Sequence, residues 1–176
     1  MPHLLYKLPI EQCNIYALQK YFNSFTPLKL LCSIMAQHFY YQFKKMLPTL
    51  HCLLVDDDKD DQDIFMLALG DLSKEITCTC ANNCGEAINL LKDTQQGMFD
   101  YIFLDLNMPK INGKQCLQEI KQIPRFQHVP VVIYSTSTDP RDRIDTKQMG
   151  ASDFISKPSD IDILSKLLAD VFNQPQ

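Results

Sequence analysis

Residues 101–105, with the sequence YIFLD, are apolar on both faces until the stretch ends in a carboxylate. A strand with one face in water alternates apolar and polar side chains. A strand that is buried on both faces does not alternate, and such strands occur in parallel sheets covered by helices. The stretch 101–105 therefore predicts a central parallel strand, and the chain around it should alternate strands with helices.

The sequence from residue 50 onward does alternate in this way. Apolar runs predict strands at 50–55, 76–81, 101–105, 129–135 and 152–156. Helical spacing of apolar residues, with capping residues, predicts helices at about 59–69, from Asn83, from near Gly113, from Asp139-Pro140 to about Met149, and at about 159–172. Five consecutive βα units predict an α/β fold with a parallel sheet between two layers of helices. We expect the flavodoxin-like, doubly wound strand order 2-1-3-4-5.

Polar side chains gather where these predicted strands end. Asp56 and Asp57 follow the first strand, and Asp105 ends the third. Ser135 ends the fourth strand, and Lys157 follows the fifth. In an open parallel sheet, the binding crevice lies at the carboxyl ends of the strands, here beside strands one and three. We therefore expect three carboxylates, a hydroxyl and an amine to face one crevice.

Three carboxylates in one crevice need a compensating charge. At a separation of roughly 4 Å, each pair would repel by about 4 kcal/mol at an effective dielectric constant near 20. Oxygen ligands with room for water suit Mg²⁺ better than Zn²⁺. Beside a bound Mg²⁺, one aspartate could attack phosphorus, while the metal and a lysine neutralise the phosphoryl oxygens. The residues thus indicate Mg²⁺-dependent phosphoryl transfer to an aspartate.

Four blocks of the sequence resemble the signature blocks of the receiver domain of two-component response regulators. They are LLVDDD at 53–58, DYIFLDLNMPKING at 100–113, VPVVIYSTS at 129–137 and GASDFISKP at 150–158. The resemblance covers about residues 50–172, with the blocks in order and at ordinary spacing. It implies a stand-alone receiver of the chemotaxis type.

The resemblance also implies roles for the acidic residues. Asp105 is the expected phosphoacceptor. Asp56, Asp57 and Asp105, with the backbone carbonyl of Asn107, are the expected ligands of Mg²⁺, for which Mn²⁺ could substitute. Asp58 is expected to cap the helix that follows, and the next acids are expected to form a solvated first helical turn.

The remaining site residues are assigned by the same resemblance. Lys157 is expected to pair with the acceptor and then with its phosphate, and Ser135 to bind the phosphoryl group. Ser135 and Phe154 are the expected switch residues. The Lys157–Pro158 bond is expected to be a cis peptide, a bond type almost restricted to proline. The protein would not be a conventional enzyme, but would catalyse its own phosphorylation and slow autodephosphorylation.

The implied partners are proteins. The phosphodonor would be a sensor histidine kinase or a histidine phosphotransfer protein, within a phosphorelay. The output would be a protein contact on the face of the fourth helix, fifth strand and fifth helix, because the sequence ends about four residues after that helix. The sequence has neither a dense basic patch for nucleic acid nor an apolar run of membrane-span length. Because a signal peptide is also lacking at the start, we expect a cytoplasmic protein.

Residues 1–45 differ in composition from residues 46–176, which we expect to form the receiver domain. The first segment has a net charge of +4 and contains no Gly, Asp or Arg, whereas the second has a net charge of −8. The first segment could be a helical extension that docks on the acidic domain or on a partner. It could also be disordered, or an artefact of an upstream start if translation begins at Met46.

Two other functions are compatible with parts of the pattern. A receiver-like binding module would signal without phosphate, but it would not need the full set of acids, hydroxyl and lysine. A hydrolase with an aspartyl-phosphate intermediate usually has a second acid two residues after the nucleophile, where this chain has Asn107.

The seven cysteines stand at irregular spacings that fit no zinc motif. Cys78, Cys80 and Cys84 come closest to a metal pattern, without a second cluster at zinc spacing. We expect the cysteines to be small buried side chains in a reducing compartment.

Overall fold

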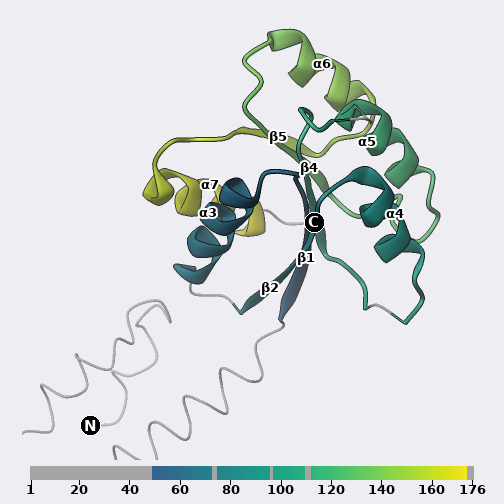
Figure 1. Cartoon of the computed structure of the whole chain (residues 1–176), viewed down its shortest axis with the longest axis horizontal. Coiled ribbons are helices and arrows are strands. Elements are labelled where there is room, and N and C mark those ends of the chain that lie inside the picture. Colours follow the sequence, from purple (N-terminus) through teal and green to yellow (C-terminus); the bar gives the residue numbers. More distant parts are fainter. Residues whose placement is uncertain (1–48, 73–74, 96, 110–111, 174–176) are drawn as a thin grey trace, which may run out of the picture. The chain divides into compact units, whose positions relative to one another are not determined.

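The computed structural model describes residues 49–72, 75–95, 97–109 and 112–173. Its sheet has five parallel strands in the order β2-β1-β3-β4-β5 (Figure 1). The strands are β1 (Leu50–Val55), β2 (Ile76–Ala81), β3 (Tyr101–Leu104), β4 (Val131–Ser135) and β5 (Asp153–Ser156). The flavodoxin-like order is confirmed. The alternatives for residues 1–45 lie outside the described residues.

A helix follows each strand. The helices are α3 (Lys59–Gly70), α4 (Cys84–Lys92), α5 (Gly113–Lys121), α6 (Pro140–Gln148) and α7 (Ile161–Asn173). The last helix begins later than the sequence suggests, because the Asp160 carboxylate accepts hydrogen bonds from the backbone N–H groups of Asp162 at 2.8 Å and Ile163 at 3.3 Å. None of the helices in the described part of the chain is both long enough and apolar enough to cross a lipid bilayer.

Side-chain caps lie at the starts of α3, α4, α5 and α6, and those of α3 and α4 border the strands β1 and β2. Asp58 caps α3 by accepting the N–H of Asp60 at 2.8 Å, as its place in the sequence predicts. Asn83 caps α4 by accepting the N–H of Glu86 at 2.9 Å. The Glu86 carboxylate accepts the N–H of Asn82, one residue before the cap, instead of completing a capping box on Asn83. The side chains of Asn83 and Glu86 therefore both hold the turn after β2.

The helices lie in two layers, and each layer encloses its own apolar core. Figure 1 shows α3 and α7 on one side of the sheet, with α4 and α5 on the other. Alternation along β1 decides which core each side chain enters: Cys52 and Leu54 pack with α3 and α7, whereas Leu53 and Val55 pack with α4 and α5. All four are fully buried, as a central strand requires.

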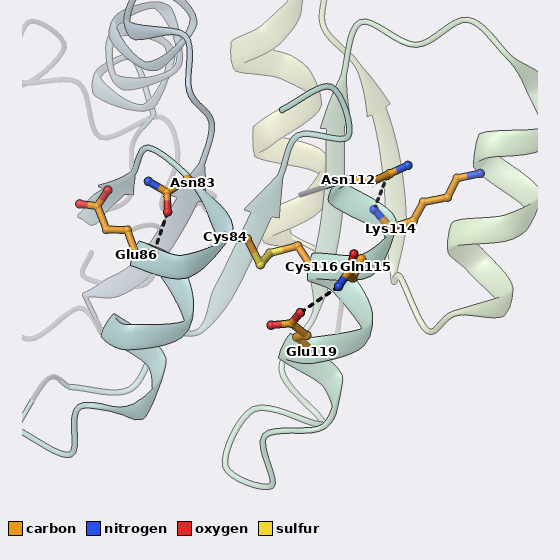
Figure 2. The surroundings of a disulfide bond; sticks show 8 residues. All are labelled: Asn83, Cys84, Glu86, Asn112, Lys114, Gln115, Cys116 and Glu119. Atoms are coloured by element: carbon orange, nitrogen blue, oxygen red, sulfur yellow. Dashed lines mark hydrogen bonds between the residues drawn. A yellow bond between two sulfur atoms is a disulfide. The ribbon is translucent and has the colours of Figure 1, made fainter. Parts of the chain in front are cut away.

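A disulfide joins the first turns of two helices in the second layer. Cys84 of α4 and Cys116 of α5 are bonded, with their Cα atoms 5.7 Å apart (Figure 2). The expectation that the cysteines are simply small buried side chains is wrong for these two. Cys84 and Cys116 are 32 residues apart in the sequence, and only the packing of α4 beside α5 brings them together. Cys52, Cys78 and Cys80 are free thiols.

Candidate functional site

The acidic residues predicted for the site continue the hydrogen-bond ladder of the sheet. The N–H of Asp56 donates to the carbonyl of Ala81 at 3.0 Å, and the N–H of Asp105 donates to the carbonyl of Val55 at 2.9 Å. Each acid therefore sits one step beyond its strand, on a backbone that neighbouring strands hold in place. Asp56 is fully buried and Asp105 is 5% exposed, whereas Asp57 lies at the surface.

The three carboxylates meet at one point. One oxygen from each of Asp56, Asp57 and Asp105 lies within 4.8 Å of the other two. Oxygen-only donors of this charge are suited to a hard divalent cation and not to the nitrogen or sulfur preference of zinc. The exposed position of Asp57 leaves one side of the cluster open to water, which a magnesium ion usually retains among its ligands. The residues present thus fit the metal that the sequence implies.

The loop that carries Asp105 is pressed against the start of α5. The N–H of Gly113 donates to the carbonyl of Leu106 at 3.2 Å. A Cβ placed on Gly113 would lie 2.3 Å from the carbonyl oxygen of Asp105, closer than any unstrained contact. Only glycine fits here, and the helix thereby fixes the backbone beneath the predicted acceptor.

Lys157 places its ammonium group among three carboxylates, which follow β1, lie in the first turn of α3 and follow β3. Its Nζ lies 2.7 Å from Asp56, 2.6 Å from Asp61 and 3.4 Å from Asp105, and the lysine side chain is only 6% exposed. Burial alone would lower the pKa of Lys157, but the hydrogen bonds to Asp56 and Asp61 and the charge of Asp105 outweigh it and raise that pKa. The lysine is therefore held in its charged form.

The cis peptide predicted between Lys157 and Pro158 is wrong. The described residues contain no cis bond. The trans form is intrinsically favoured before proline by about 0.5–1 kcal/mol. In the trans arrangement the N–H of Lys157 still donates to the carbonyl of Ser135 at 2.9 Å, so the sheet continues to the lysine and its side chain reaches the acids.

Asp61 was expected to be a solvated acid in the first turn of α3, and the structure corrects this. Its carboxylate makes the shortest of the three contacts with Lys157. The signal in the sequence was the spacing: a helix that begins just after Asp56 turns its third residue back over the end of β1. Without the position of Lys157, that spacing could not distinguish a site residue from a surface acid.

Asp56 lies in a buried environment that shifts its pKa. Burial raises the pKa of Asp56 above its ordinary value of 3.8, although the hydrogen bond and charge of Lys157 oppose the shift. Gln62 also supports this position, because its side-chain N–H₂ donates to the backbone carbonyl of Asp56 at 2.7 Å and to Asn82 at 3.1 Å. Gln62 is 1% exposed and was not singled out from the sequence.

The remaining polar residues of the site lie at the end of β4 and in the loops that follow β3 and β4. Ser135 is fully buried, and its hydroxyl accepts the N–H of Ser137 at 3.4 Å. The side-chain amide of Asn107 donates to the hydroxyl of Thr136 at 3.0 Å, and the N–H of Asn107 donates to the carboxylate of Asp105 at 3.2 Å. These bonds join the loop after β3 to the loop after β4.

The predicted switch aromatic faces inward. Phe154 is 8% exposed and packs in the core beneath α4 and α5. Arg143 of α6 places its guanidinium carbon 4.9 Å from the centre of the Phe154 ring and donates to the carbonyl of Phe154 at 2.8 Å. Arg143 therefore covers the ring on the side of α6.

Comparisons with known proteins agree on one family. The family model for the response regulator receiver domain matches residues 52–169. The response regulator Rre1 of Synechocystis is 31% identical over 131 residues, which make up 74% of this chain and 55% of Rre1. The two-component response regulator ORR8 of Oryza sativa is 32% identical over 108 residues, or 61% of this chain and 86% of ORR8. This chain spans about half the length of Rre1 and less of some other curated relatives.

Solved structures of response regulators share the fold. The Mn²⁺-bound form of Rcp1 is 28% identical and superposes with a TM-score of 0.60, over 69% of this chain and 91% of Rcp1. The phosphorylated cyanobacterial phytochrome response regulator RcpA is also 28% identical, with a TM-score of 0.61, over 70% of this chain and 91% of RcpA. The chemotaxis response regulator CheY4 of Vibrio cholerae is 25% identical, with a TM-score of 0.61, over 70% of this chain and 99% of CheY4. Since the family model covers well over half of the sequence, the chain belongs to the response regulator receiver domain family.

Proposed function

We propose that Asp105 accepts a phosphoryl group from the phosphohistidine of a sensor histidine kinase or a histidine phosphotransfer protein. One observation carries this proposal: the acids Asp56 and Asp57 and the ammonium group of Lys157 converge on the Asp105 carboxylate. The family supports phosphoryl transfer, and the donor set supports Mg²⁺ as the cofactor, with Mn²⁺ able to replace it.

In the proposed reaction, a carboxylate oxygen of Asp105 attacks phosphorus while the bond to the donor histidine nitrogen breaks. Lys157 donates to the transferring phosphoryl oxygens and offsets their charge. Asp56, Asp57, Asp105 and the backbone carbonyl of Asn107 would hold the metal, which when bound would neutralise phosphoryl charge and help to align the group. Water attacking the same phosphorus would break its bond to the Asp105 oxygen, release inorganic phosphate and restore the Asp105 carboxylate, so the domain would also remove its own phosphoryl group slowly.

The phosphate would become a signal through Ser135 and Phe154. An aspartyl phosphate presents strong acceptor oxygens, and the buried hydroxyl of Ser135 would turn to donate to one of them. A charge-assisted hydrogen bond contributes about 1.5–3 kcal/mol, and moving a two-state population from 1:99 to 99:1 needs about 5.5 kcal/mol. About two to four new contacts of this kind therefore supply the free energy of a full switch.

The surface proposed to report the switch is formed by α6, β5 and α7. A groove on this face is lined by residues that include Arg143, Lys147 and Phe154, and by Ile144, which is 56% exposed. Any movement of the Phe154 ring would displace Arg143, which covers it. A downstream protein that docks here would thus sense the state of Asp105 without contacting it.

The proposed unit is residues 46–176, acting in the cytoplasm as a stand-alone receiver in a phosphorelay, with no direct contact to nucleic acid. The alternative is a receiver-like module that binds a partner without phosphorylation. Incubation with Mg²⁺ and acetyl phosphate distinguishes the two by intact mass. We expect an acid-stable, base-labile adduct of about 80 Da, one phosphoryl group, which is absent from Asp105→Asn.

The other outcomes of this experiment have defined meanings. A parent protein that gains no mass with Mg²⁺ and acetyl phosphate would favour the binding module. Rapid multiple turnover of a phosphate ester would instead favour a hydrolase, although the residue two positions after the acceptor is Asn107 and not an acid.

A further inference from the structure

The ammonium group of Lys157 lies nearer to two other carboxylates than to the predicted acceptor. Its Nζ is 2.6 Å from Asp61 and 2.7 Å from Asp56, but 3.4 Å from Asp105. A lysine ammonium has three donors, and three carboxylates already take all of them. Any new acceptor on Asp105 must therefore displace one of the contacts that exist.

Asp61 is distinct from the other acids of its helical turn. Its side chain is 30% exposed and contacts the buried lysine, whose side chain is 6% exposed. Asp60, one residue earlier, is exposed and contributes only its backbone N–H to the cap on Asp58. Asp63 is 68% exposed and pairs with Lys59 at 3.8 Å. The position of Asp61 on α3 therefore selects it alone from these three acids for contact with the site lysine.

Asp61 is also distinct from Asp56 in what it can do besides bind the lysine. Asp56 belongs to the three-carboxylate cluster suited to a divalent cation, so a metal would draw its charge away from Lys157. Asp61 is not one of the three acids in that cluster. When the cluster is loaded, Asp61 is the carboxylate left to compete with Asp105 for the ammonium group.

We propose that Asp61 is a positioning residue that draws the Lys157 ammonium away from Asp105 and so competes with the phosphoryl group for it. This inference rests on the phosphoacceptor role proposed for Asp105. Phosphorylation exchanges the Asp61–Lys157 ion pair for a phosphoryl–Lys157 pair, and the strength of the first pair reduces the stability gained from the second. Asp61 would thereby set how much of the receiver is phosphorylated at a given supply of donor.

Beryllofluoride tests this competition at equilibrium, because it binds an aspartate carboxylate with the shape and charge of a phosphoryl group. Its dissociation constant can be measured by calorimetry at saturating Mg²⁺, which separates the effect from any change in metal affinity. We expect Asp61→Asn to bind beryllofluoride about fivefold more tightly than the parent, the scale of a partly exposed ion pair. Asp60→Asn removes the same charge one residue away and should bind as the parent does.

A double-mutant cycle assigns the effect to the lysine. In a Lys157→Gln background, Asp61→Asn should change the dissociation constant by less than twofold, because the competing pair is already absent. A role of Asp61 in stability alone would weaken binding or leave it unchanged, so the direction of the change separates the two roles. Tighter binding that persists without Lys157 would overturn the inference in favour of a general charge effect.

The result for the parent protein separates this inference from the proposed function. If the parent binds beryllofluoride with Mg²⁺ and Asp61→Asn binds equally or more weakly, the competition is refuted while the phosphoacceptor role stands. If the parent binds none and gains no phosphoryl mass, both the phosphoacceptor role and the competition are refuted.

Discussion

Gly113 lies against the backbone of Asp105 so closely that a Cβ on it would stand 2.3 Å from the Asp105 carbonyl oxygen. The start of α5 and the predicted phosphoacceptor are thus one packed unit. An added methyl group must push either the helix or the acceptor loop away, because its neighbours are backbone atoms that cannot rotate aside. This contact gives the first test of how the fold positions the site.

Gly113→Ala should lower the free energy of unfolding by about 1–3 kcal/mol, the usual cost of overpacking. It should also slow phosphorylation by acetyl phosphate, because the displaced loop carries Asp105. Chemical denaturation and the rate of mass gain measure the two effects. Gly70→Ala in α3 is the matched control, since nothing lies within 4 Å of a Cβ there; it should not slow phosphorylation, and it should keep or raise the free energy of unfolding by up to about 1 kcal/mol. Wild-type values for Gly113→Ala would show that the loop accommodates the methyl group.

Removing one acid from the three-carboxylate cluster tests the metal site. Asp57→Ala should abolish both Mg²⁺ binding and phosphorylation, because two remaining carboxylates hold a divalent cation far more weakly. Asp57 is exposed, so its loss should not unfold the domain. Calorimetric titration with Mg²⁺ measures the affinity, and Asp60→Asn controls for the loss of one surface charge. An Asp57→Ala variant that still binds Mg²⁺ like the parent would place the metal elsewhere.

The disulfide predicts a redox dependence of stability. Closing a loop of 32 residues between Cys84 and Cys116 restricts the unfolded chain, which stabilises the folded state by about 3–4 kcal/mol. The midpoint of chemical denaturation should therefore fall when a reductant is added to the oxidised protein. The double variant Cys84→Ala with Cys116→Ala should be insensitive to the reductant. If the denaturation midpoint of the oxidised parent stays the same when the reductant is added, the disulfide contributes no stability.

The fold could be predicted because its signals are local. The apolar run at 101–104 and the carboxylates that follow strands both depend on neighbours in the sequence, and they located the strands and the acids. The strand order then followed from general rules for parallel sheets built from βα units. The structure fixed relations between distant residues. The Cys84–Cys116 bond has no local signature, and the place of Asp61 in the first turn of α3 does not by itself reveal its contact with Lys157, 96 residues away. Each depends on which helices lie beside which strands.

The predicted cis peptide shows a different limit. The expectation came from the resemblance of residues 150–158 to a family motif, and not from a physical requirement of the chain. Because the trans and cis forms before proline differ by only about 0.5–1 kcal/mol, small local contacts decide between them. The Lys157 ammonium reaches the site acids with the trans bond present, so a cis bond is not required to bring the lysine to the site.

Alkaline pH should destabilise the domain through groups that keep their protons when folded. Burial raises the pKa of Tyr134 from 10.0 to about 12, although nearby Lys157 opposes the shift. Above pH 10 the unfolded chain loses the Tyr134 proton while the folded chain retains it, so this contribution is intact below pH 10 and is lost as the pH rises toward 12. Cys80 acts in the same direction, because burial raises its pKa from 9.0 to about 11.

The free energy of unfolding should therefore fall as the pH rises from 10 to 12, with about 2 kcal/mol of the decrease due to Tyr134. Denaturant titrations across this range measure the slope. Tyr134→Phe preserves the ring, which packs edge-on against Phe65 at a centroid distance of 5.2 Å, and removes only the ionising hydroxyl. The variant should lose less stability over the same range than the parent. Equal losses in the two proteins would assign the alkaline transition to the remaining titrating groups, and the Tyr134 hydroxyl would then have no part in it.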